Sequence, residues 1–151
     1  MISPDAQLVP DVFAKDIPRA PTRDGFGRGT LEAGKKDANV VVLCADLKES
    51  TRAEWFEKEF PDRFFDVGIA EQHAISFAGA LARGGLKPVV ALYSSFLQRA
   101  HDSVMHDVAL QRQSVVIGVD RAGLVGADGA THQGIFDLAY LGAVPGIVLA
   151  S

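Results

Sequence analysis

The chain has 151 residues, of which 48% are hydrophobic and 23% are charged, which is typical of a single globular domain with one buried core. Its net charge of −4 at pH 7 argues against a broadly basic surface for nucleic acid or anionic lipid. We therefore expect no nucleic-acid partner. No hydrophobic run approaches the roughly 18 residues that a membrane span needs, so we also expect no membrane partner. We expect the protein to be located in the cytoplasm.

The first 21 residues contain four prolines and show little hydrophobic periodicity. Proline fixes its own backbone angle and lacks an N–H donor, so it disfavours regular structure. We therefore interpret residues 1–21 as an arm or linker that can lie across a neighbour, and residues 22–151 as the domain. The segment also lacks the basic flank and long apolar core of a secretory signal peptide.

The stretch 22–38, "TRDGFGRGTLEAGKKDA", has the apolar spacing of a helix. Thr22 is placed as its N-cap, and Lys35 and Lys36 lie near its end, where cations favour the helix dipole. Glycines within the stretch lower its intrinsic helix propensity. The pattern still predicts a helix that opens the domain.

The next predicted elements are a strand at 39–45, a helix at 53–60 and a strand within 63–69. The first strand, "NVVVLCA", is a continuous β-branched run, which indicates burial on both faces. Cys44 lies inside this run and is interpreted as a small buried hydrophobic residue, not as a reactive thiol. A helix of small residues follows from about residue 70 to 83 and is stopped by two glycines.

Further along, the sequence predicts a strand at 87–93, a long helix at 95–111 and a strand at 114–120. A glycine-rich loop then leads to a helix near 135–141, and "GIVLAS" at 146–151 is predicted to begin another strand. Alternation of strands and helices predicts an α/β domain with a mostly parallel sheet. Since nothing follows this last strand to cover it, we expect the domain to lack its C-terminal part.

Polar and aromatic residues gather just after the predicted strands. In an open parallel sheet, ligands bind beyond the carboxyl ends of the strands, so these residues should share one rim. They are Asp46, Glu71, Gln72, His73, Tyr93, Ser94, Phe96, Arg99, Arg121, Asp128 and His132. Taken singly, each has a structural explanation: Glu71 favours the helix dipole, and Asp128 before a glycine suits a turn. Their clustering on one rim favours a site.

Other kinds of site match the sequence poorly. His101 and His106 are five residues apart on a predicted helix, so they point in directions about 140° apart and do not suit one metal ion. No G-x-S-x-G nucleophile elbow is present. The glycine-rich loop is neither G-x-G-x-x-G nor a P-loop, so a nucleotide fingerprint is also missing.

Four separated blocks carry a resemblance to a known family. "FFDVGIAEQHA", "ALYSSFLQRA", "HDVALQ" and "DRAGLVGADGATHQGIFDLAYL" resemble, in the same order, the pyrimidine-binding domain of 1-deoxy-D-xylulose-5-phosphate synthase, in the transketolase superfamily. The upstream stretch from residue 22 looks more like transketolases that are split into two subunits. The resemblance covers residues 22–151 and implies a three-layer α/β domain with the thiamin-diphosphate-binding fold.

The resemblance also implies roles for the rim residues toward thiamin diphosphate. Glu71 would hydrogen-bond N1′ of the aminopyrimidine and promote the 4′-imino tautomer, whose nitrogen removes the proton from the thiazolium carbon. Such a carboxylate must be held out of bulk water, which the apolar residues around Glu71 can do. Phe96 would stack on the pyrimidine ring, and His73 would support the cofactor end of the site.

Five further matches concern the acceptor substrate. In the synthase, the corresponding positions line the pocket that binds the hydroxyls and phosphate of glyceraldehyde 3-phosphate, a phosphorylated sugar. The residues are Tyr93, Arg99, Arg121, Asp128 and His132. Arginine suits phosphate because its planar guanidinium donates paired hydrogen bonds.

The sequence departs from the family in two respects. His101 stands where the synthase usually has tyrosine, and the G-D-G motif that grips diphosphate and Mg²⁺ is absent. We therefore expect no metal ligand in this chain. We expect another domain or subunit of the same enzyme to hold the diphosphate and Mg²⁺. We also expect the protein to form a dimer, either homo- or heteromeric.

Two alternatives to a synthase-like enzyme remain open. One is the small subunit of a split transketolase. The other is a truncated, non-catalytic interaction domain, in which the small residues of the 70–83 helix would allow close packing with a partner; these are Ala74, Ala78, Gly79 and Ala82.

Overall fold

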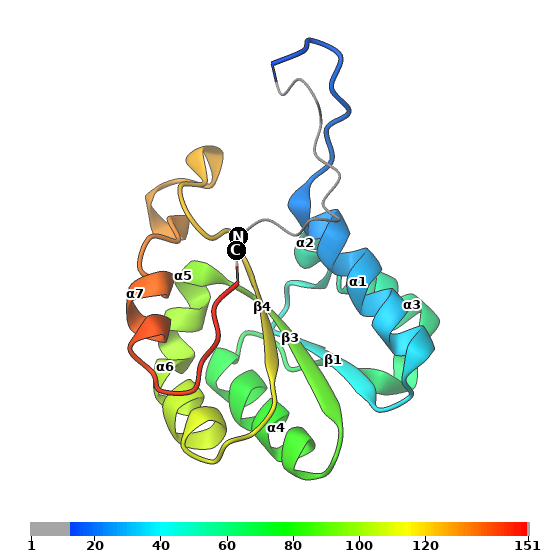
Figure 1. Ribbon diagram of the computed structural model, residues 1–151, viewed down its shortest axis with the longest axis vertical. Coiled ribbons are helices and arrows are strands. Elements are labelled where there is room, and N and C mark those ends of the chain that lie inside the picture. The colour runs from blue at the N-terminus through cyan, green and yellow to red at the C-terminus, as the bar shows by residue number, and fades with distance from the viewer. Residues whose placement is uncertain (1–12, 151) are drawn as a thin grey trace, which may run out of the picture.

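A computed structural model describes residues 13–150 of the chain (Figure 1). Its sheet has four parallel strands in the order β2-β1-β3-β4. The strands are β1 (Val40–Cys44), β2 (Phe64–Asp66), β3 (Lys87–Tyr93) and β4 (Val116–Asp120). The predicted α/β class with a parallel sheet is confirmed, because helices separate the strands along the chain.

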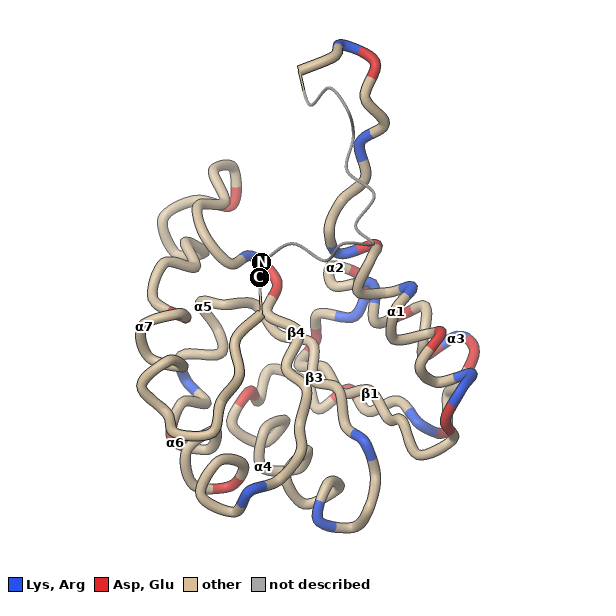
Figure 2. The backbone as a smooth tube through the Cα atoms, in the orientation of Figure 1, with Lys and Arg blue, Asp and Glu red and all other residues tan. Residues whose placement is uncertain are grey.

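Helices cover both faces of the sheet, which gives the predicted three layers (Figures 1 and 2). The helices are α1 (Thr22–Lys36), α2 (Lys48–Thr51), α3 (Glu54–Glu59), α4 (Glu71–Arg83), α5 (Ser94–Leu97), α6 (His101–Ser103) and α7 (Asp137–Gly142). Short 3₁₀ turns occupy Pro61–Arg63, Gln98–Ala100, Gly126–Asp128 and Ala130–His132, and a π-helical segment occupies Val104–Ala109.

Strand β1 is buried along its whole length and divides the core in two. Successive residues of a strand point to opposite faces, so Val42 packs toward Phe56 of α3 while Leu43 packs toward Ile75 of α4. This explains the unbroken Val run in the sequence. Cys44 is buried as predicted, and desolvation raises the pKa of its thiol to about 12, so the thiol stays protonated at neutral pH.

Glycines let α1 lie close against α3. A Cβ atom at Gly34 would stand 2.5 Å from the Phe56 ring, and one at Gly27 would stand 2.7 Å from Trp55. These glycines weaken helix propensity but allow the packing that stabilises α1. The predicted N-cap was wrong by one residue: Thr22 is already helical, and Pro21 precedes it in extended conformation without a side-chain cap.

The long helix predicted at 95–111 is present over 94–109, but it is not a regular α-helix. The chain instead passes through α5, a 3₁₀ turn, α6 and the π-helical segment. The wider turns of that segment are visible in the hydrogen bond from Leu110 N–H to the Met105 carbonyl, 2.8 Å long and five residues back. Tertiary packing explains the distortion, because the segment widens where the backbone of Asp107 approaches Gly79 of α4.

The small residues of α4 pack inside this chain. Ala74, Ala78 and Gly79 are buried, the first two in one core cluster with Val104 and Val108 of the π-helical segment. A Cβ atom at Gly79 would stand only 2.8 Å from the Asp107 carbonyl oxygen. The protein's own core therefore covers Ala74, Ala78 and Gly79, and the expectation that they face a partner is wrong. Ala82 is only partly buried, so its contact with a partner stays a prediction.

We expect Gly79→Ala to lower the free energy of unfolding by about 1–3 kcal/mol, because the added methyl group meets backbone that has little room to move. Gly25→Ala is the matched control. Gly25 is exposed on α1, and no atom lies within 4 Å of the place that a Cβ atom would take there, so alanine should raise stability by about 0.5–1 kcal/mol. Urea unfolding monitored by circular dichroism measures both, and equal effects would contradict the packing described for α4.

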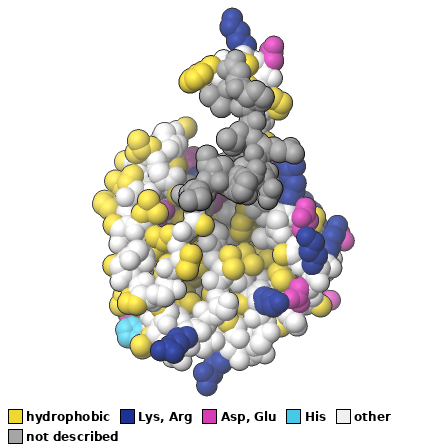
Figure 3. Space-filling model, viewed as in Figure 1, with side chains coloured by type: hydrophobic (Ala, Val, Ile, Leu, Met, Phe, Trp, Pro, Cys, Tyr) yellow, Lys and Arg dark blue, Asp and Glu magenta, His cyan; other side chains and the backbone are white. Residues whose placement is uncertain are grey.

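The structure describes only part of the arm predicted at the N-terminus and most of the strand predicted at the C-terminus. Residues 1–12 of the predicted arm lie outside the described residues, and 13–21 contain neither helix nor strand. The strand predicted at 146–151 is not formed over 146–150, and Ser151 lies outside the described residues. Residues 145–150 instead line a groove against β4, where Val116 and Val148 are exposed. Figure 3 shows hydrophobic side chains on the face of the molecule that it draws. No helix among the described residues is long and apolar enough to cross a membrane.

Candidate active site

The predicted rim exists where the carboxyl ends of the strands meet the start of α4, the start of α5 and the loop after β4. The resemblance assigns roles to eight residues, and seven of these eight are joined by a continuous series of contacts at this rim. They are Glu71, Arg99, Phe96, Tyr93, His132, Arg121 and Asp128. We refer to them as the rim cluster.

Glu71 is the buried acid of the rim cluster. It is the first residue of α4 and only 3% exposed, although a carboxylate is normally solvated. Its carboxylate lies 3.6 Å from the Arg99 guanidinium, which is longer than a hydrogen bond. No hydrogen bond from another described residue reaches this carboxylate. A largely buried carboxylate whose ion pair with Arg99 is this long is unusual, so the position suits a ligand that donates a proton or a hydrogen bond.

Aromatic rings lie between Arg99, the ion-pair partner of Glu71, and the glycine-rich loop. Tyr93 and Phe96 stack with their ring centroids 5.3 Å apart, and His132 meets Phe96 edge-on at 5.2 Å. The guanidinium of Arg99 lies over the other end of this group, 5.6 Å from the centre of the Phe96 ring. The arrangement places a cluster of aromatic rings near a largely buried carboxylate.

Arg121 lies at the opposite end of the rim cluster. Its side chain is folded over the Tyr93 ring, 4.6 Å from the centroid, and makes ion pairs of 2.9 Å with both Asp120 and Asp128. Partial burial by itself would lower the pKa of Arg121, but the hydrogen bond to Asp128 and the charge of Asp120 raise it above its ordinary value. The guanidinium is therefore a fixed positive charge.

The glycine-rich loop is held against the turn after β3. Backbone hydrogen bonds join Gly123 and Gly134 in both directions, 2.6 and 2.9 Å long. A Cβ atom at Gly134 would overlap the Arg121 carbonyl and the Ser94 side chain, so only glycine permits this approach. The Gln133 side chain bonds Val125 N–H and the Gly129 carbonyl, which fixes the loop next to His132.

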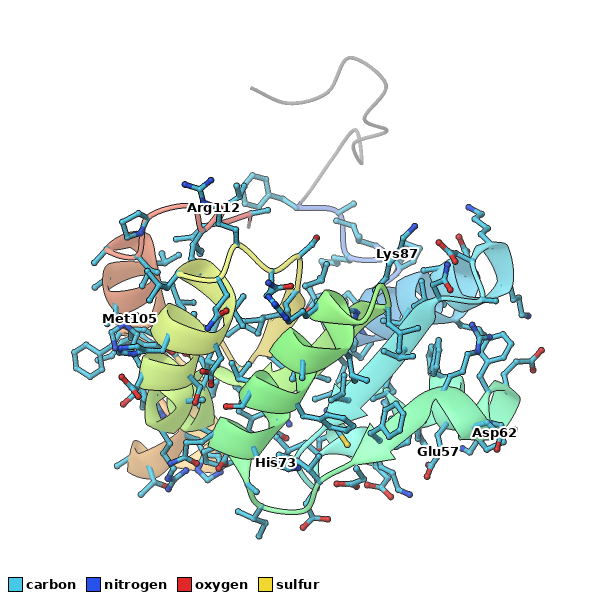
Figure 4. The ribbon with its side chains drawn as sticks, turned by 90° about the horizontal axis from the view of Figure 1, so that it is seen from below. Glu57, Asp62, His73, Lys87, Met105 and Arg112 are labelled. Carbon is cyan, nitrogen blue, oxygen red and sulfur yellow. The ribbon has the colours of Figure 1, made fainter. Side chains whose placement is uncertain are left out.

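His73 is not part of the rim cluster's contacts. It lies on the exposed side of the first turn of α4 and stacks on Phe77, with ring centroids 5.7 Å apart (Figure 4). Its expected support of a cofactor stays a prediction.

His101 packs edge-on against Tyr140 at 5.2 Å, and its buried Nε2 has no hydrogen-bond partner among the described residues. Burial raises the pKa of Tyr140 to about 12, so its hydroxyl stays protonated.

Sequence reasoning missed Asp120 and Gln133. Asp120 is the last residue of β4 and so satisfies the strand-end rule, but it was counted with the strand. Gln133 carried no signal in the sequence, since its role depends on how the loop folds back. Asp120 holds Arg121, and Gln133 fixes the loop that carries Asp128 and His132.

The rim cluster combines three chemical capacities. A buried carboxylate can hold or exchange a proton with a ring nitrogen, and the aromatic surface beside it can stack a planar heterocycle. The Arg121 guanidinium offers paired donors to a phosphate. The cluster therefore suits a ligand with a nitrogen heterocycle together with a phosphorylated substrate.

Comparison with known proteins shows the family to which this chain is similar. Residues 19–151 match the family model of the transketolase pyrimidine-binding domain. The chain is 55% identical over 124 residues to 1-deoxy-D-xylulose-5-phosphate synthase of Halothermothrix orenii, and 56% identical to that of Paraburkholderia xenovorans. Each alignment covers 82% of this chain and 20% of the relative, so the chain spans about a fifth of the length of these curated relatives.

Solved structures give the same fold. A split-gene transketolase described as an inactive beta4 tetramer is 36% identical, with a TM-score of 0.71 over 82% of this chain and 40% of that one. Transketolase from Campylobacter jejuni is 26% identical, with a TM-score of 0.76 over 82% of this chain and 20% of that one.

Proposed function

Because this chain belongs to the family of transketolase pyrimidine-binding domains, we propose that it is the pyrimidine-binding part of a thiamin-diphosphate-dependent, ketol-transferring enzyme. The enzyme proposed is most similar to 1-deoxy-D-xylulose-5-phosphate synthase, which would join pyruvate to glyceraldehyde 3-phosphate on the route to isoprenoid precursors. The identity of about 55% to synthases supports that choice over other members of the superfamily. The observation that carries the proposal is the largely buried carboxylate of Glu71, whose ion pair with Arg99 is 3.6 Å long.

The residues present fit the pyrimidine end of thiamin diphosphate. The Glu71 carboxylate needs a donor, which a protonated ring nitrogen supplies, and Phe96 presents a half-buried aromatic ring for stacking. When bound, thiamin diphosphate would supply the nucleophilic carbon that ketol transfer needs. In this proposal Glu71 holds and returns the proton at the pyrimidine nitrogen, and burial keeps water from competing for it.

The acceptor end of the proposed site is built on Arg121. Its guanidinium would bind the phosphate of the acceptor, while Tyr93 and His132 lie close enough to each other to contact one substrate. Arg99 and Asp128 complete the polar lining. His73, on the exposed side of α4, would contact the cofactor only once a second domain covers that face.

We assign the diphosphate and Mg²⁺ to another domain or subunit. The sequence lacks the G-D-G motif for them, and no group of three metal-type side chains comes together among residues 13–150. A split-gene neighbour supports a partner subunit as one arrangement. Dimerisation and a cytoplasmic location belong to this same proposal.

A specific observation keeps a small transketolase subunit as the second candidate. The split-gene transketolase is the more similar in sequence of the two solved structures described above, at 36% identity. The donor distinguishes the two functions. The chain is combined with a diphosphate-binding partner, thiamin diphosphate, Mg²⁺ and glyceraldehyde 3-phosphate, and product is followed by mass spectrometry. Pyruvate and a ketose phosphate are supplied as the donor in separate reactions. We expect product with pyruvate, together with release of CO₂. Product that forms only with the ketose phosphate would favour the transketolase subunit.

A further inference from the structure

Arg121 is held by two carboxylates whose surroundings differ. We infer that Asp120 is a permanent positioning residue for Arg121, whereas Asp128 is an exchangeable counter-ion that leaves the guanidinium when the phosphate of a substrate binds. The inference rests on the proposed function, since it assigns the phosphate of the acceptor to Arg121.

Asp120 grips Arg121 at two points. One carboxylate oxygen accepts the backbone N–H of Arg121 at 2.8 Å, and the other accepts the guanidinium Nη1 at 2.9 Å. Arg121 has a φ of +58°, a left-handed conformation that is uncommon for residues with a side chain. The double contact joins the strained backbone to the guanidinium, so Asp120 directs the side chain back over Tyr93.

Asp128 holds a different part of the guanidinium. Its carboxylate accepts the Nε N–H at 2.9 Å. Nε and Nη2 form one edge of the guanidinium, the edge that can donate two parallel hydrogen bonds to a phosphate. A phosphate that binds this edge in the paired geometry must take the place of Asp128, while the contact of Nη1 with Asp120 can remain.

Charge and mobility favour the same exchange. Two carboxylates around one guanidinium give a net charge of −1, which repels a phosphate as long as both remain. The Asp128 side chain is 38% exposed, against 20% for Asp120. Asp128 also lies on the loop between Gly126 and Gly129, which both have positive φ angles, whereas Asp120 is fixed in β4. The loop carboxylate is therefore the one that can move away.

The test measures binding of inorganic phosphate to the intact chain by isothermal titration calorimetry at constant ionic strength and pH 7. Asp128→Asn removes the competing charge, so we expect the phosphate Kd to fall about tenfold. Asp120→Asn keeps an oxygen for the backbone N–H but loses the charge that orients the guanidinium, so we expect the Kd to rise about tenfold. Asp102→Asn is the matched control, because Asp102 is exposed on α6 and pairs with His106, away from Arg121.

Several outcomes would overturn the inference: no detectable phosphate binding by the wild-type chain, weaker or unchanged binding by Asp128→Asn, or an unchanged Kd in Asp120→Asn. A purely structural role for Asp120 would lower the melting temperature without moving the Kd, so each variant is also melted. Phosphate binding requires neither thiamin diphosphate nor a partner. If the chain forms product with its partner but the two phosphate Kd changes are absent, this inference alone is refuted. If both Kd changes are found but no product forms with the partner, the proposed function is refuted.

Discussion

Replacing Glu71 with glutamine should lower kcat of the completed enzyme by about 10²–10⁴-fold, the range typical of removing a general acid or base. Glutamine preserves the size of the side chain and can still form a hydrogen bond, but it cannot accept and return a proton. The measurement is the steady-state rate with partner, thiamin diphosphate, Mg²⁺ and saturating substrates. Because the carboxylate is only 3% exposed, solvent water should not replace it.

Glu32→Gln is the control for this substitution. Glu32 is an exposed carboxylate on α1, so its replacement removes the same charge from the opposite side of the sheet. We expect its kcat to stay within about twofold of wild type, since isolated surface substitutions have small effects. The melting temperature of Glu71→Gln should not fall, because the variant removes a largely buried charge whose ion pair with the exposed Arg99 is long, at 3.6 Å. A Glu71→Gln enzyme that keeps more than a tenth of the activity would contradict the assignment.

The parts of the fold that follow from local pattern were predictable. The Val run at 40–44 predicts a strand buried on both faces, and the small-residue stretch ended by Gly84 predicts α4 within one residue. The strand-end rule then placed Glu71, Tyr93 and Arg121 on one rim, because parallel strands all end at the same edge. Most of the rim cluster could therefore be predicted without coordinates.

Features set by tertiary contacts could not be predicted in this way. The π-helical segment depends on how Asp107 meets Gly79, two residues 28 positions apart in sequence. The residues after 145 look like a strand, but a strand requires a partner edge in the correct register, which the sequence pattern alone does not specify. His73 is close to Glu71 in sequence, yet helix geometry turns it toward the exposed side.

Arg121→Lys should reduce kcat/KM for glyceraldehyde 3-phosphate by about 10²-fold, most of it through KM. Lysine keeps the positive charge but lacks the planar pair of donors, so it can neither bind a phosphate in the paired geometry nor keep both carboxylates at 2.9 Å. The matching measurement uses D-glyceraldehyde as acceptor. With no phosphate to bind, this acceptor should react with wild type and variant at rates that differ by less than about threefold.

Arg28→Lys provides the control for the arginine-to-lysine change, because Arg28 lies exposed on α1, on the other face of the sheet from the rim helices. Its kinetic constants should match wild type for both acceptors. If Arg121→Lys lowered kcat/KM equally for the phosphorylated and unphosphorylated acceptors, Arg121 would act on the reacting carbons or on the loop, and not on the phosphate. The ratio between the two acceptors, and not the size of either loss, therefore decides the role of Arg121, since damage to the loop lowers both rates together.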